Sequence, residues 1–103
     1  MANNTVKVVA RITAQPDKIE EVESLLLGLV GDTRKESGCI NYQLLQNKAD
    51  PSDFTFVEEW ESDSAIDNHF ITPHMQNAFL KAVPLLAKEP DIRRYLDISS
   101  AES

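Results

Sequence analysis

The chain has 103 residues, of which 42% are hydrophobic and 26% are charged, the size and balance of one globular domain. Its formal net charge of -7 disfavours binding to nucleic-acid phosphates or to anionic lipid surfaces. With Cys39 as its single cysteine, it can form no intrachain disulfide and no zinc site with two thiolates. No apolar run approaches the roughly 20 residues that cross a membrane, and no signal peptide is evident, so we expect a cytoplasmic protein.

Three elements are predicted in the first half of the chain. Alternating apolar residues over Thr5–Ala14 predict a strand. We expect a helix to begin at Pro16, to carry an apolar stripe at spacings of three and four, and to stop near Gly38. A second strand is predicted over Cys39–Gln46, with Ile40 and Tyr42 on the same face.

The second half predicts two strands with helical segments between them. The strand Phe54–Glu61 places Glu58 and Trp60 on one face. Helix-start signals at Ser62-Asp63 and at Thr72-Pro73 predict a short helix to about Phe70 and a longer one to about Leu86. The longer helix is expected to point Met75, Phe79, Ala82, Val83 and Leu86 inward, and Ile92–Ile98 is expected to be the last strand.

The order of these elements predicts an α+β fold of ferredoxin-like βαββαβ topology. We expect one domain over residues 1–103, with an ordered core at about 5–98. Helices on one side of an antiparallel sheet leave its other face open, and that face carries apolar residues here. A second copy is the simplest cover, so a homodimer with opposed sheet faces is expected.

The two histidines, His69 and His74, are the first candidates for chemistry. Histidine titrates near neutral pH and therefore suits proton transfer to or from a bound molecule. On spacing alone, one core histidine and one capping or surface histidine is an equally good interpretation. As a metal site the pair is weak, because no clear third ligand stands nearby.

Three further side chains could belong to a site. Glu58 lies beside aromatic residues on its strand face, where it could act as a base or anchor a histidine. Tyr42 and Trp60 are more typical of core packing, although both could form a pocket wall. No phosphate-binding glycine loop, dinucleotide fingerprint or serine nucleophile elbow is found, so the usual motifs for NAD or flavin are missing.

Four short segments resemble one known family over nearly the whole chain: ESGCINY at 36–42, EWES at 59–62, AIDNH at 65–69 and TPHM at 72–75. They are similar to the antibiotic-biosynthesis-monooxygenase family, and most of all to its bacterial quinol monooxygenase branch. The resemblance implies a dimeric α+β barrel. It also implies oxygenation of electron-rich aromatic molecules without metal, flavin or nicotinamide, in a dry pocket that holds a base.

The resemblance therefore predicts a cofactor-independent monooxygenase that acts on a quinol-like or polyphenolic aromatic molecule with dioxygen. We expect no cofactor and no metal. His69 is expected to be the leading base, with His74 and Glu58 assisting. The expected substrate-binding residues are Tyr42, Trp60, Met75 and Phe79.

Alternatives remain within the same fold. The heme-degrading branch places an asparagine, a tryptophan and a histidine where this chain has Ala10, His69 and Phe79, so heme breakdown is discounted. The branch that isomerises a phosphorylated autoinducer also has a His-x-x-x-Pro-His arrangement, which His69 to His74 match. It would move protons without oxygen. A third possibility is a dimeric ligand-binding protein without turnover.

Overall fold

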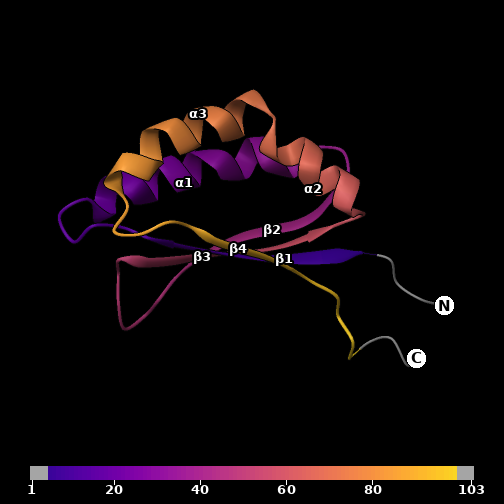
Figure 1. The fold of residues 1–103 in the computed structure, drawn as a ribbon, viewed down its shortest axis with the longest axis horizontal. Helices are drawn as coiled ribbons and strands as arrows, with labels where there is room; N and C mark the ends of the chain where they lie inside the picture. Colours follow the sequence, from indigo (N-terminus) through magenta and orange to yellow (C-terminus); the bar gives the residue numbers. More distant parts are fainter. Residues whose placement is uncertain (1–4, 100–103) are drawn as a thin grey trace.

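Four strands form one antiparallel sheet in the computed structural model, which describes residues 5–99. The strands are β1 (Val6–Thr13), β2 (Cys39–Gln46), β3 (Asp53–Trp60) and β4 (Asp91–Tyr95), in the spatial order β2-β3-β1-β4. Three helices pack on one face of this sheet, and no other described element covers the opposite face (Figure 1). The α+β ferredoxin-like prediction is confirmed.

The central strands β1 and β3 follow the predicted alternation. Val8 pairs with Glu58 and Ala10 with Phe56, and all four side chains are buried under the helices. Phe54 and Trp60 lie on the same face of β3 and are 1% and 0% exposed. This face of the sheet packs against the helices and forms one side of the hydrophobic core.

The edge strand β2 departs from simple alternation. Its pairing with β3 shifts by one residue between Cys39 and Asn41, which leaves Ile40 in a bulge. Ile40 is 49% exposed, whereas Tyr42 is buried at 1%. The prediction that these two residues share a face was therefore wrong, because an extra residue reverses the alternation.

The first helix, α1 (Ile19–Arg34), begins three residues later than predicted. Pro16 lies instead in a turn that the N–H of Lys18 closes by donating to the oxygen of Gln15. Proline favours such a position because its φ is already fixed. Gly38 also lies outside the helix, in the turn before β2, with a φ of 90°. A Cβ at this position would come within 2.6 Å of the Cβ of Ala65 in the next helix, α2 (Asp63–Phe70).

The helices α2 (Asp63–Phe70) and α3 (Pro73–Ala82) begin as predicted, with Ser62 and Thr72 as their N-caps. The end of α2 at Phe70 is confirmed, whereas the end of α3, predicted at about Leu86, was placed too far along the chain. Pro84 cannot continue a helix, so residues 83–85 form a 3₁₀ turn, η1 (Val83–Leu85), and Val83 is half exposed rather than inward.

The last strand also ends early. Tyr95 pairs with Lys7, and β1 offers only one more residue beyond that point. Ile98 therefore has no partner in β1, and β4 ends at Tyr95, which corrects the predicted end at Ile98; Leu96 and Ile98 are 70% and 84% exposed. No helix in the described part of the chain is long and apolar enough to cross a membrane.

Candidate functional site

A small cavity of about 20 Å³ lies between the sheet and the helices. Its walls come from every layer of the fold: Ala10, Ile12, Tyr42, Phe56, Glu58 and Ile92 from the sheet, and Leu26, Leu29, Phe70, Met75 and Phe79 from the helices. A space of this size holds about one water molecule. Glu58 is the only ionisable carboxyl group among these apolar and aromatic walls.

Glu58 is positioned by the strand itself. Residues two apart on β3 point to the same face, so the indole Nε1 of Trp60 donates to Oε1 of Glu58 at 2.8 Å. Glu58 is 5% exposed. Burial raises the pKa of Glu58 to about 7, the charge of Glu36 acts in the same direction, and the bond from Trp60 opposes both. Near neutral pH this carboxyl can therefore both hold and release a proton.

Aromatic rings surround this carboxyl group. The ring of Tyr42 lies 4.9 Å from that of Phe56 and 6.5 Å from that of Trp60, measured between centroids. Arg34 holds the backbone of β2 at this point: its Nη2 and Nε donate to the backbone carbonyl oxygen of Tyr42, at 2.8 and 3.1 Å. Burial, reinforced by the charge of Glu58, raises the pKa of Tyr42 well above its usual range, so its hydroxyl stays protonated.

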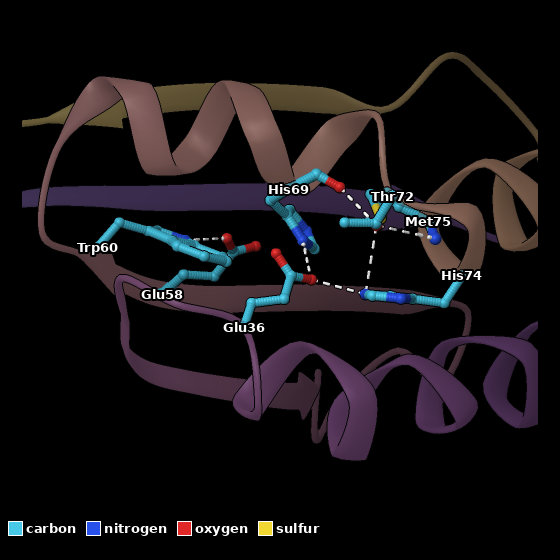
Figure 2. Close-up of polar contacts among 7 residues, drawn as sticks. All are labelled: Glu36, Glu58, Trp60, His69, Thr72, His74 and Met75. Atoms are coloured by element: carbon cyan, nitrogen blue, oxygen red, sulfur yellow. Dashed lines mark hydrogen bonds and ion pairs between the residues drawn. The ribbon is translucent and has the colours of Figure 1, made fainter.

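A second polar cluster lies where α2 meets α3, and we call Glu36, His69 and His74 the joint cluster. Figure 2 shows both imidazole rings directed at the carboxylate of Glu36, which comes from the segment between α1 and β2. Nδ1 of His69 and Nε2 of His74 donate to the same oxygen, Oε2, at 2.8 and 2.6 Å. A carboxylate only accepts, so these nitrogens carry the protons and Nε2 of His69 is left as an acceptor.

The helix ends set this geometry. His69 lies in the last turn of α2 and His74 is the second residue of α3. Between them, the hydroxyl of Thr72 donates to the backbone oxygen of His69 at 2.7 Å and accepts from the N–H of Met75 at 3.4 Å. His69 is 1% exposed, and its Nε2 has no hydrogen-bond partner among the described residues. Burial lowers the pKa of His69, and the bond to Glu36 counteracts part of this shift.

The structure divides the expected site residues between these two regions. Glu58, Tyr42, Met75 and Phe79 line the cavity. Trp60 lies beside them, and the ring of His69 lies 4.8 Å from the Trp60 ring but does not line the cavity. His74 lies farther along the joint, linked to His69 through Glu36.

Glu36 was missed by the sequence interpretation, which found no third group near the histidines. It lies 33 residues before His69, so no local spacing connects them. Glu58, which could have anchored a histidine, instead accepts from Trp60. The only signal for Glu36 is that it opens the ESGCINY segment at 36–42.

Comparison with known proteins adds independent information. A sequence model of the family described as "Antibiotic biosynthesis monooxygenase" matches residues 5–81. Two curated relatives named "Putative monooxygenase", YcnE of Bacillus subtilis and Rv0793 of Mycobacterium tuberculosis, are each 32% identical to this chain. The matches cover 82% and 81% of this chain, and 90% and 81% of the relatives.

Solved structures agree with these matches. A protein described as an antibiotic biosynthesis monooxygenase superimposes with a TM-score of 0.87 at 29% identity, covering 90% of this chain and 98% of that one. PA3566 of Pseudomonas aeruginosa superimposes with a TM-score of 0.86 at 30% identity, covering 95% and 98%.

Proposed function

The chain belongs to the antibiotic biosynthesis monooxygenase family, and from this premise we propose that it is a cofactor-independent monooxygenase that oxidises a quinol-like or polyphenolic aromatic molecule. The observation that carries the proposal is Glu58. A carboxyl group with a pKa of about 7 faces a cavity whose other walls are apolar or aromatic. Such a group suits removal of a proton from a phenolic hydroxyl in a dry pocket.

In this proposal Glu58 takes the leading role that the sequence interpretation gave to His69, because Glu58 lines the cavity and His69 does not. The Glu58 carboxylate takes a proton from the quinol, and the resulting anion can donate an electron to dioxygen. Overall, a quinol and one dioxygen give a hydroxyquinone and one water. The ring supplies all the electrons, one oxygen atom forms the new C–O bond, and the other leaves as water.

Substrate entry requires movement of the helix side chains. The cavity of about 20 Å³ is far smaller than an aromatic ring, so Phe70, Met75 and Phe79 must shift to admit one. Phe70 and Phe79 also line an apolar surface groove of about 620 Å³, together with Leu80, Val83 and other residues around α3. This shared wall supports entry of an apolar ring from the groove side.

We further propose that the enzyme is a homodimer joined through its open sheet faces. The register places Val9, Val57, Leu45 and Tyr95 on the face away from the helices, where Leu45 and Tyr95 are 48% and 47% exposed. Apolar groups on an uncovered sheet favour a second layer. Light scattering should give twice the chain mass at micromolar concentration, and a monomer mass would contradict the dimer.

The test of the activity is oxygen uptake by chelator-treated protein with a panel of hydroquinones, corrected for autoxidation. We expect Glu58→Gln to reduce turnover by about 100-fold or more, as for loss of a general base. Glu61→Gln is the matched control, because Glu61 follows the same strand, is exposed and does not line the cavity. Isotopically labelled dioxygen should place one labelled atom in the product.

Two outcomes would contradict the proposal. Full turnover in Glu58→Gln would remove this carboxyl group from the mechanism. No uptake with any hydroquinone, together with oxygen-independent conversion of a phosphorylated carbonyl compound, would favour the isomerase instead, while recovery of an unchanged bound ligand would favour a binding protein.

A further inference from the structure

The joint cluster has the composition of a metal site. Among residues 5–99, Glu36, His69 and His74 form the one group of at least three His, Cys, Asp or Glu residues whose potential ligand atoms converge, all within 4.8 Å of one another. Two imidazoles and one carboxylate are a ligand set that proteins use for zinc, with a further position open to water. The same set also suits iron(II).

We propose that Glu36, His69 and His74 bind a divalent transition-metal ion through Oε2, Nδ1 and Nε2 respectively. This goes beyond the proposed oxidation, because none of the three residues lines the cavity and the ion takes no part in the proposed proton removal. The ion would link the segment after α1 to both sides of the α2–α3 joint.

The present distances show what binding requires. Oε2 of Glu36 lies 2.8 Å from Nδ1 of His69 and 2.6 Å from Nε2 of His74. Ligands of a tetrahedral zinc ion with bonds of about 2.0 to 2.1 Å lie roughly 3.3 Å apart. Each contact to Glu36 would therefore lengthen by roughly half an ångström, and the two imidazole nitrogens, which now lie within 4.8 Å of each other, would have to reach the same spacing of roughly 3.3 Å. The side chains of His74 and Glu36 are partly exposed and can make this adjustment, while His69 is held in place by the rings of Tyr42 and Trp60.

Binding needs a change of tautomer at both histidines, and at His69 it places the proton on the buried Nε2, which has no hydrogen-bond partner among the described residues. Each nitrogen that now donates to Glu36 can present its lone pair when the ring proton moves to the other nitrogen, so two neutral histidines remain neutral. His69 is buried, but the side chains of His74 and Glu36 are 23% and 13% exposed. An ion can thus enter from the outer side, where a water molecule can complete its coordination.

Cobalt(II) is the probe for the test, added to untagged, metal-free, full-length protein. Trp60 is the only tryptophan of the chain, and its ring lies 4.8 Å from that of His69. Binding should therefore quench the tryptophan fluorescence. It should also produce the visible absorption bands of a cobalt(II) ion in a coordination site of low symmetry. Zinc should compete and restore the fluorescence. Neither readout depends on oxygen uptake, so this inference can fail while the proposed oxidation holds, and the reverse.

Glu36→Gln and His74→Asn should each weaken cobalt affinity by about 10-fold or more, since loss of a ligand costs at least as much as loss of an outer partner. Glu61→Gln is the control, because it removes an exposed negative charge near Gly38 without removing a ligand. Circular dichroism checks that each variant is folded. If Glu36→Gln unfolds, the cobalt affinity of His74→Asn is the test, because His74 is partly exposed and its replacement disturbs the core less. Absence of quenching at millimolar cobalt, or unchanged affinity in His74→Asn, would overturn the site.

Discussion

The cavity and the joint cluster each contain one carboxylate, and the two differ in their hydrogen-bond donors and in their surroundings. Glu58 receives one bond, from the indole of Trp60, and is otherwise surrounded by apolar walls. Glu36 receives two imidazole N–H groups on a single oxygen at the edge of the protein. Their elements differ too, because Glu58 projects from a central strand and Glu36 from the connection after α1.

This difference shows how surroundings divide one residue type between two tasks. A buried carboxyl group with few donors favours its protonated form and can exchange a proton. A carboxylate that accepts two donors is held as a fixed acceptor that orients its partners. The chain therefore has a proton-exchanging group at the cavity and, beside it, a carboxylate that holds two imidazole rings.

The largest expected effect is a dependence of the free energy of unfolding on pH that comes from Glu58. The folded-state pKa of Glu58, about 7, lies above its ordinary value of 4.5, so the folded protein binds a proton that the unfolded chain releases. Glu58 therefore contributes stability below about pH 4.5 that is lost as the pH rises to about 7, up to about 3 kcal/mol. Glu58→Gln should remove this loss, so the stability of the variant relative to the wild type should increase as the pH rises. Urea unfolding across this range measures the difference, and parallel curves for the two proteins would contradict it.

A smaller effect is expected at the joint. Glu36→Ala leaves the buried N–H of His69 without an acceptor, which should lower the free energy of unfolding by about 2 kcal/mol. Glu61→Ala, at an exposed position, should change it by less than about 0.5 kcal/mol. Equal stability of Glu36→Ala and wild type in urea would show that the cluster does not hold the joint together.

The smallest effect concerns the two helix caps. Ser62→Ala and Thr72→Ala should each cost about 1 kcal/mol, because each removes an N-cap oxygen. Only Thr72 also lies within 3.3 Å of Nε2 of His74. A double-mutant cycle with Glu36→Ala should therefore show coupling of about 0.5 kcal/mol or more for Thr72 and none for Ser62. Equal coupling for both caps would remove Thr72 from the joint network.

Most of the fold could be predicted because its signals are local. Strand alternation placed Glu58 and Trp60 on one face, and the pairs Ser62-Asp63 and Thr72-Pro73 marked the starts of two helices. Element ends were harder to place, since they depend on partners elsewhere in the chain. Ile98 has the residue type of a strand, but the sheet ends earlier because β1 offers no residue to pair with it.

The site was predicted only in part for the same reason. Residues near aromatic or histidine motifs, such as Tyr42 and His74, could be named from their neighbours in sequence. Glu36 could not, because its role depends on two helices that follow about 30 residues later. The bulge at Ile40 was equally hidden, since one inserted residue changes the pairing without changing the pattern of residue types.

Gly38 has a consequence for engineering this protein. Its φ is positive, and any side chain there would place its Cβ only 2.6 Å from the Cβ of Ala65, so two positions 27 residues apart must be treated as one unit. A library that varies the segment around Glu36 while randomising position 38 would consist mostly of chains whose α2 cannot dock. Keeping glycine at 38 and alanine at 65 would preserve the packing of this turn against α2, so that the effect of each substitution at Glu36, His69 or His74 could be measured without a second change in the fold.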